Sequence, residues 1–469
     1  MQCTDSFTAL LLEFQRVFTQ PSFHIFLSLM TGWVLSHRRR FVTDMIWSSG
    51  CVRKGHHSRY HRFFSAAQWS LDALCCVLAI MLVAVFAPTG CIILSIDDTL
   101  CRKRGLGIFG AGMHHDPLIS SRAKPLVSWG HDWVVACLVI CGLPWAPTKV
   151  WSLPIGFRLY RNRQGLTKGK KKGKGKKKGQ QKTKSKRKRD PNHRTRPELA
   201  VELISLISSW FPDRQIIIVG DSAYGGKSVL QKLPANVDLI SQVFPTGVLY
   251  EPAPVPPPVA PGEKKRSGRH RKKGKRLPDM ATWAADDTQP WKEMKFDQFG
   301  LHTTLLVKTC KALYYTAGKD RLLTIVLTRD AEGKRPDHRF YCTRLDWSPR
   351  QILSAYAARW SIEVTFENTK QHLGLEDAAN RTEKAVRRTA PMALVLYSLI
   401  VFWFHRVGHR YVRFPDRPWY PHKSEPSFAD MLTTLRRMSW QDKFCGVCLK
   451  SRLAKKELAS IIEFLCLSG

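Results

Sequence analysis

The chain has 469 residues, of which 44% are hydrophobic, so it is long and apolar enough to form a sizeable core and more than one domain. Its 75 lysines and arginines outnumber its 37 aspartates and glutamates, which gives a formal net charge of +38. A charge of this size favours nucleic acid as a partner, while the length and apolar content favour an enzyme over a ribosomal or chromatin protein.

Residues 1–75 are predicted to form a small helical domain that binds DNA. The segment 7–18, FTALLLEFQRVF, has apolar residues at helical spacing, and the segment 37–65 interleaves cations with aromatic residues. Such interleaving suits contact with DNA phosphates. A solvated charged face on a packing domain would have the same composition, so the sequence leaves both interpretations open.

Residues 76–250 have the pattern of a mixed sheet. Apolar or β-branched runs predict four strands, and a helix with apolar residues three and four apart is predicted before the last strand. Strands and a helix in this order indicate a mixed α/β sheet. The predicted strands are 91–100, 125–142, 151–160 and 214–220, and the predicted helix is 196–211.

Two basic stretches interrupt the predicted elements. Residues 168–189 hold 14 lysines or arginines among 22 residues and cannot bury a core, so 165–192 is predicted to be a disordered loop. Residues 251–276 are rich in proline and then in basic residues, which predicts an extended loop. Both loops would either clamp DNA without sequence preference or only keep the protein soluble.

The rest of the chain is predicted to hold a β-rich insertion followed by helices. The insertion occupies 251–345, with strands at 301–315, 321–330 and 338–345. Residues 346–410 are predicted to be helical, beginning with a long helix from about Pro349, because proline suits a first helical turn. A C-terminal helical region is predicted for 411–469.

Two apolar runs, 73–87 and 390–404, resemble membrane helices but are shorter than the ~20 residues that a span needs. We therefore predict that both are core helices and that no membrane is involved. The first residues lack the basic region of a signal peptide, and the 13 cysteines follow no disulfide pattern. These features predict a cytoplasmic protein.

Three aspartates follow apolar strands. Asp97 and Asp98 end the apolar run that opens CIILSIDDTL, and Asp221 follows IIIVG. Aspartate often ends a strand only as a turn former. In a protein this basic, however, carboxylates at the rim of a sheet suggest hard oxygen ligands for Mg²⁺, which would grip substrate phosphates. Phosphodiester cleavage by two metal ions needs a further carboxylate, which can come from far along the chain.

A candidate for this carboxylate lies in YAARWSIEVTFENTK. On a continuous helix, with about 100° per residue, its charged residues and its first tyrosine would share one narrow stripe. A solvent-facing stripe would look the same, so helical geometry does not choose among these residues. They are Tyr356, Arg359, Glu363, Glu367 and Lys370.

The spacing within this stripe resembles a known signature. Tyr356, Arg359, Glu363 and Lys370 match every position of Y-x2-R-x3-E-x6-K, the signature of a group of DDE transposases from bacterial insertion sequences. The segments IDDT and VGDSAYGG are similar to the first and second aspartate motifs of that group. In that group an inserted β-rich domain separates the second aspartate from the glutamate, which fits the predicted strands here.

The resemblance implies a fold and a set of site residues. The fold would be an RNase H-like mixed sheet flanked by helices. Asp98, Asp221 and Glu363 would be the catalytic residues and would hold two Mg²⁺ or Mn²⁺ ions; Asp98 is preferred to Asp97 because it directly precedes the threonine of the motif. The resemblance also implies that Tyr356, Arg359 and Lys370 contact the DNA backbone.

The implied function is cut-and-paste transposition by metal-dependent cleavage and strand transfer. Its partners would be double-stranded DNA, namely the inverted repeats at the element ends and the target, and a second copy of the chain in a synaptic dimer at the nucleoid. An RNase H-like endonuclease that cuts without joining is an alternative. A second alternative is an inactive or domesticated transposase that only binds DNA.

Overall fold

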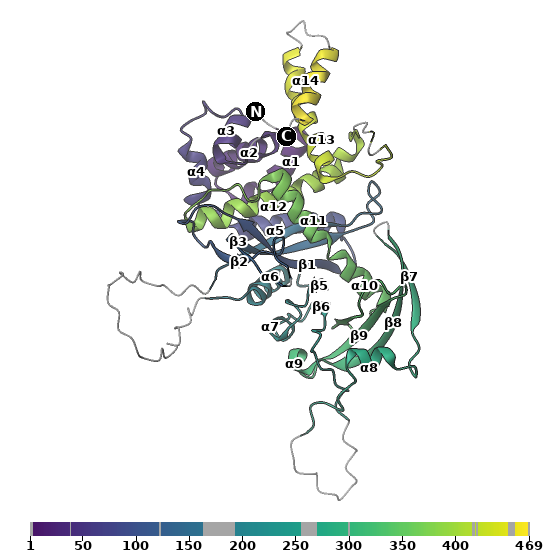
Figure 1. Cartoon of the computed structure of the whole chain (residues 1–469). Coiled ribbons are helices and arrows are strands. Elements are labelled where there is room, and N and C mark those ends of the chain that lie inside the picture. The colour runs from purple at the N-terminus through teal and green to yellow at the C-terminus, as the bar shows by residue number, and fades with distance from the viewer. Residues whose placement is uncertain are drawn as a thin grey trace, which may run out of the picture.

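The computed structural model describes residues 3–37, 39–121, 123–162, 193–254, 270–298, 301–414, 418, 421–448 and 455–467. The stretch 165–192, predicted to be a disordered loop, lies outside the described residues, and so does the central part of the Pro-rich stretch (255–269). The described residues form one large mixed sheet flanked by helices (Figure 1), which confirms the predicted fold class.

The N-terminal part of the chain is helical, as predicted. Its aromatic side chains pack together: the rings of Phe18 and Phe26 are 4.8 Å apart, and those of Phe63 and Trp69 are 5.1 Å apart. Packed rings bury much apolar surface and hold these short helices together in spite of their many cations. The elements are α1 (Asp5–Leu12), η1 (Gln15–Val17), α2 (Gln20–Leu35), α3 (Val42–Ser48) and α4 (Ser58–Ser65).

The sheet has ten strands within the described residues, in the order β2-β3-β1-β5-β6-β10-β9-β8-β7, with β4 beside β3. Its centre is mixed: β1 runs parallel to β5, and β5 to β6, whereas β3 runs antiparallel to β1. The strands are β1 (Ile92–Arg102), β2 (Gly112–His115), β3 (Val127–Ile140), β4 (Trp151–Tyr160), β5 (Ile216–Gly220), β6 (Val237–Gln242), β7 (Lys292–Gln298), β8 (Leu301–Leu313), β9 (Leu322–Asp330) and β10 (His338–Cys342).

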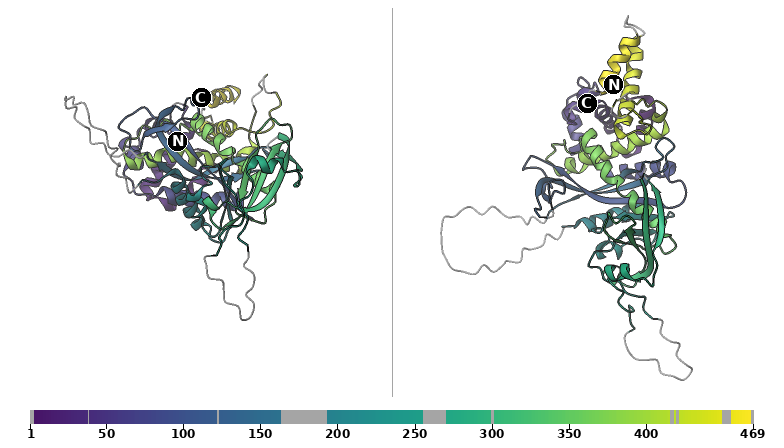
Figure 2. Two further views of the ribbon diagram at one scale, coloured as in Figure 1. Left: turned by 60° about the horizontal axis from the view of Figure 1, so that its bottom comes forward. Right: turned by 45° about the vertical axis from the view of Figure 1, so that its right-hand side comes forward.

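Helices cover both faces of the central strands (Figures 1 and 2). The helices α5, α11 and α12 lie over one face, and α6 and α7 lie over the other. The start of α6 is set by a capping box, in which Thr195 and Glu198 each bond the other's backbone. The bounds are α5 (Leu71–Phe86), α6 (Arg196–Trp210), α7 (Lys227–Leu230), α11 (Ser361–Leu373) and α12 (Glu383–Arg406).

The predicted β-rich insertion is present, and it continues the central sheet. The strands β7 to β10 follow one another as an antiparallel meander, and β10 pairs with β6, with Phe340 opposite Gln242. The insertion therefore shares a hydrogen-bonded edge with the core. The remaining elements are α8 (Met280–Ala285), α9 (Tyr315–Gly318), α10 (Pro349–Ala358), η2 (Gly408–Arg410), α13 (Phe428–Cys448) and α14 (Lys455–Leu467).

The helix α12 is almost completely buried. By length and composition it is the one helix among the described residues that could cross a membrane, but 94% of its most apolar stretch is buried inside the protein. Its Arg388 donates to backbone oxygens of the α4–α5 segment, including that of Ala67 at 2.8 Å, and so joins α12 to the N-terminal helices. The apolar run 390–404 is therefore part of a core helix, as predicted.

Candidate active site

The two predicted aspartate motifs meet at the centre of the sheet. The last residue pair between the parallel strands β1 and β5 is Ile96 and Gly220, so the next residues, Asp97 and Asp221, follow side by side. Asp221 directly follows β5, as predicted. The prediction that the first pair of aspartates ends its strand is wrong: β1 continues to Arg102, because β3 stays paired with it beyond the aspartates.

Asp97 and Asp98 point to opposite faces of the sheet, because side chains alternate along a strand. Two residues before Asp97, the Ser95 hydroxyl lies 3.1 Å from that of Ser152, which lies 2.6 Å from the hydroxyl of Ser361 at the start of α11. Ser95 and Asp97 thus share the face covered by α11. Asp98 faces α6 and the loop after β5.

The helix predicted to begin at about Pro349 is two helices. It starts as expected, with Pro349 in the first turn and a capping box made by Ser348 and Gln351, but α10 ends at Ala358 and α11 begins at Ser361. Between them the backbone bonds tighten to i→i−3, as in the bond from Arg359 to the carbonyl of Tyr356. The predicted single stripe is therefore interrupted.

The break places Arg359 and Glu363 near Asp97. Nη1 of Arg359 donates a 2.6 Å hydrogen bond to Oδ2 of Asp97, and these side chains are only 14% and 12% exposed. Burial raises the pKa of Asp97 to about 8; Arg359 opposes this rise, and the negative charges of Glu363, Asp98 and Asp221 add to it. Asp97, Asp221 and Glu363 are called the carboxylate site below.

Of the other signature residues, Tyr356 lies beside this site, and Lys370 lies further away along α11. Tyr356 packs on Phe340, with ring centroids 4.6 Å apart. Burial raises the pKa of Tyr356; the positive charge of Arg359 opposes this rise, and the negative charge of Asp221 adds to it. Lys370 lies further along α11, near Cys101 at the end of β1. Burial raises the pKa of the Cys101 thiol to about 12, and the positive charge of Lys370 opposes this rise more than any other charge does. Glu367 is exposed.

Asp98 belongs to a second set of polar side chains, which we call the reverse-face network. The Tyr224 hydroxyl donates a 2.6 Å hydrogen bond to Oδ1 of Asp98, and Nε of Arg196 lies 3.2 Å from Oδ2. Arg196 also donates to Asp132 at 2.6 Å. Burial raises the pKa of Asp132, and Asp98 adds to that rise. The members of the network are Asp98, Asp132, Arg196, Tyr224 and His114.

The histidines near the first strands are not placed at the carboxylate site. Nδ1 of His114 lies 3.5 Å from Asp132 in the reverse-face network, and burial lowers the pKa of His114 to about 4. Nε2 of His131 lies 2.9 Å from the carbonyl of Phe109, and burial lowers its pKa to about 4 as well. Both are buried structural histidines, and His115 is exposed.

Three residues of the reverse-face network, namely Tyr224, Arg196 and Asp132, were not assigned roles from the sequence. Tyr224 lies in the second aspartate motif, and the apolar residues Leu94 and Ile96 lie at the same strand parity as Asp98. This alternation along the strand was the available signal for Asp98, because it places Asp98 on the same face of β1 as the buried side chains of Leu94 and Ile96. Asp132, which accepts a hydrogen bond from Arg196, had no comparable signal in the sequence.

The chemistry of the carboxylate site fits a divalent cation. Burial is the main cause of the raised pKa of Asp97, and the negative charges of Glu363 and Asp221 add to it; carboxylate oxygens are the ligands that Mg²⁺ and Mn²⁺ prefer. Among the described residues no three His, Cys, Asp or Glu side chains are arranged to hold a metal ion together. Arg359 is the cation that contacts Asp97. A metal would therefore have to take over contacts that Arg359 makes.

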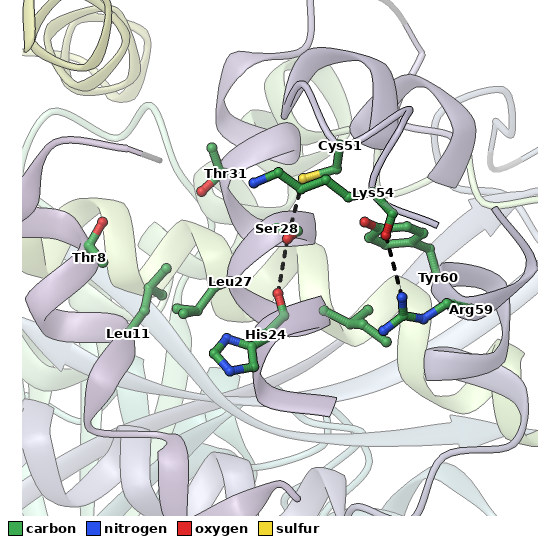
Figure 3. A pocket seen from close by; sticks show the side chains of 11 residues that line it. Thr8, Leu11, His24, Leu27, Ser28, Thr31, Cys51, Lys54, Arg59 and Tyr60 are labelled. Atoms are coloured by element: carbon green, nitrogen blue, oxygen red, sulfur yellow. Dashed lines mark hydrogen bonds between the residues drawn. The ribbon is translucent and has the colours of Figure 1, made fainter. Parts of the chain in front are cut away.

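A separate cavity of about 550 Å³ lies among the N-terminal helices (Figure 3). The sulfur of Cys51 lies 3.5 Å from the Ser28 hydroxyl, which donates to the carbonyl of His24 at 2.9 Å. Lys54 and Arg59 bring positive charge to the cavity, and its described lining contains no acidic residue. It is therefore a polar hollow without the carboxylates that metal chemistry requires.

Comparison with known proteins identifies the family. A family model described as DDE superfamily endonuclease matches residues 13–304. This range contains Asp97 and Asp221 and ends before α10 and α11, so the match does not depend on the signature residues there. No curated protein matches the chain. Because the matched range covers more than half of the chain, the protein belongs to the DDE superfamily endonucleases, whose substrate is DNA.

Proposed function

We propose that the protein is a transposase of the Y-x2-R-x3-E-x6-K group, which cuts DNA at the ends of an insertion sequence and joins them to a target. The observation that supports this most directly is the carboxylate site: Asp97, within β1, lies beside Asp221, which directly follows the neighbouring parallel strand β5, and the charge of Glu363 acts on Asp97. Three carboxylates beside basic side chains suit a phosphodiester substrate.

In this proposal Asp97 replaces Asp98 as the first metal ligand. Asp98 is engaged by Tyr224 and Arg196 on the other face, whereas Asp97 shares a face with α11. Asp97, Asp221 and Glu363 would hold two Mg²⁺ or Mn²⁺ ions. When bound, such ions supply an activated water and stabilise the entering and leaving oxygens of the phosphodiester.

The basic side chains would position the DNA. Arg359 and Lys370 would contact backbone phosphates near the cut end, and Tyr356 would support Arg359 from the side of α10. The N-terminal helices, with Lys54 and Arg59 at their surface, would bind the same duplex further along. Cutting two ends in one event implies a dimer on the two inverted repeats, acting in the cytoplasm at the nucleoid.

The proposal is tested by incubating purified protein and Mg²⁺ with a donor carrying the inverted repeats that flank its gene and with a target plasmid. We expect cleaved ends and joined donor–target products. Cleavage without joining would contradict the transposase proposal and favour a nuclease of the same family. The variants Asp221→Asn and Glu363→Gln should abolish both products, and if either variant kept full cleavage, the proposed site would be wrong.

A further inference from the structure

Arg359 holds the oxygen of Asp97 that a metal ion would need. Its Nη1 donates to Oδ2 of Asp97 at 2.6 Å, and both side chains are largely withdrawn from solvent. The residue sits in the tight turn between α10 and α11 and has right-handed helical torsions, so its backbone is held by i→i−3 bonds on both sides. The contact is therefore built into the turn and is not a chance approach of two flexible surface chains.

The guanidinium is only partly satisfied in this position. Its Nε is buried and has no hydrogen-bond partner among the described residues, and its carbon lies 5.7 Å from the centre of the Tyr356 ring. Arginine carries five N–H donors in a planar fork, which matches phosphate oxygens in a bidentate way. A DNA phosphate would thus offer Arg359 more hydrogen bonds than Asp97 does.

A metal ion and Arg359 would compete for Asp97. Both are cations, and the carboxylate is buried, so placing them together on the same oxygens brings like charges close in a region of low polarity. While Arg359 stays on Asp97, metal binding there has to displace it. When a phosphate draws Arg359 away, Oδ2 of Asp97 becomes free beside Asp221 and Glu363, while Oδ1 keeps its 2.9 Å hydrogen bond from the backbone N–H of Asp98.

We propose that Arg359 couples the two binding events, so that the carboxylate site takes up its metal ions when DNA is bound and resists them when DNA is absent. This inference rests on the proposed function of the carboxylate site. Coupling between two ligands is reciprocal: if DNA raises metal affinity, the metal raises DNA affinity by the same factor. Couplings of this kind are typically about 5–150-fold.

The first test measures Mn²⁺ affinity of the full chain without DNA, by titration calorimetry at about pH 8.5, where protons compete least for carboxylates. Arg359→Gln should bind Mn²⁺ at least tenfold more tightly than the unchanged protein. Arg387→Gln is the matched control, because it removes the same charge from a surface ion pair with Glu383 and should leave affinity unchanged. Equal or weaker binding by Arg359→Gln would overturn the proposal.

The second test does not depend on the variant's folding. The affinity of the unchanged protein for a short fluorescent duplex is measured by anisotropy in Ca²⁺ and in EDTA at equal ionic strength. We expect at least fivefold tighter binding in Ca²⁺, and no difference would overturn the coupling. The variants Asp97→Asn and Glu363→Gln distinguish failure of the proposed metal site from failure of the coupling. If neither variant weakens Mn²⁺ binding, the proposed metal site is wrong. If both weaken it and Arg359→Gln does not bind Mn²⁺ more tightly, only the coupling is wrong.

Discussion

The Tyr224 hydroxyl donates a 2.6 Å hydrogen bond to Oδ1 of Asp98 and thereby ties the loop after β5 to the middle of β1. The backbone N–H of Tyr224 also donates to Oδ1 of Asp221, at 3.3 Å. One residue thus contacts an aspartate of each motif. Tyr224 therefore links Asp221 to the strand residue next to Asp97.

Tyr224→Phe removes that hydroxyl and leaves Asp98 without one of its donors. A hydrogen bond to a charged group contributes about 1.5–3 kcal/mol, so we expect cleavage to fall by about tenfold or more while DNA affinity stays unchanged. Single-turnover cleavage and duplex anisotropy measure the two quantities. Tyr411→Phe, at an exposed tyrosine, is the control. A variant that is merely less stable, with an unchanged cleavage rate, would contradict a positioning role for Tyr224.

Gly225→Ala should disturb the same loop through steric conflict. A Cβ at Gly225 would lie 2.2 Å from the hydroxyl oxygen of Ser241, which donates to the carbonyl of Asp221 at 2.7 Å. Something must move, and the backbone of Asp221 is the nearest part of the site. We expect lower Mn²⁺ affinity and slower cleavage, measured on the same preparations. The neighbouring Gly226→Ala meets no atom within 4 Å and should have little effect, so equal losses in both variants would count against this explanation.

Metal affinity should rise with pH. Burial raises the pKa of Asp97 to about 8, above its ordinary value of 3.8, so a proton competes for this carboxyl at neutral pH. A metal ion binds the ionised form and must displace that proton. Mn²⁺ affinity should therefore increase by up to tenfold per unit as pH rises towards about 8 and level off above it. A profile that is flat from acidic to neutral pH would show that Asp97 is not a ligand.

Arg388 should matter for stability and not for chemistry. It is buried in α12, lies 4.1 Å from the centre of the Trp69 ring and donates to backbone oxygens at the end of α4 and in the loop before α5. Arg388→Ala leaves those oxygens unpaired, which we expect to reduce the free energy of unfolding by about 2–4 kcal/mol. Urea unfolding followed by circular dichroism measures it. Cleavage per folded molecule should stay the same, and a loss below 0.5 kcal/mol (roughly the effect of a surface substitution) would contradict the assigned role.

Much of the fold was predictable because its central elements have strong local patterns. The apolar runs that became β1, β3, β4 and β5, and the meander of β8 to β10, have the β-branched composition of buried strands. The capping residues Thr195 and Ser348 mark helix starts that the sequence also indicated. The joining of the insertion to β6 was not predictable, because strand pairing depends on contacts between residues about 100 positions apart.

The candidate site was predictable in part. Its place after an apolar run singled out Asp221, and the resemblance to the signature singled out Glu363. The interruption between α10 and α11 follows from tertiary packing, since Arg359 and Trp360 have ordinary helical preferences. Choosing between Asp97 and Asp98 needs the face of β1 that α11 covers. That face is identified by hydroxyl contacts between three separate elements, in which Ser152 on β4 lies between Ser95 on β1 and Ser361 on α11.

The central claim, that Asp97 and not Asp98 is the first metal ligand, is tested most directly by exchanging each aspartate for cysteine and measuring DNA cleavage in Mg²⁺ and in Mn²⁺. A thiolate binds Mg²⁺ poorly and accepts softer metals better. We predict that Asp97→Cys is inactive in Mg²⁺ and regains cleavage in Mn²⁺, while Asp98→Cys loses activity equally in both. Rescue of Asp98→Cys by Mn²⁺, with no rescue of Asp97→Cys, would contradict the account.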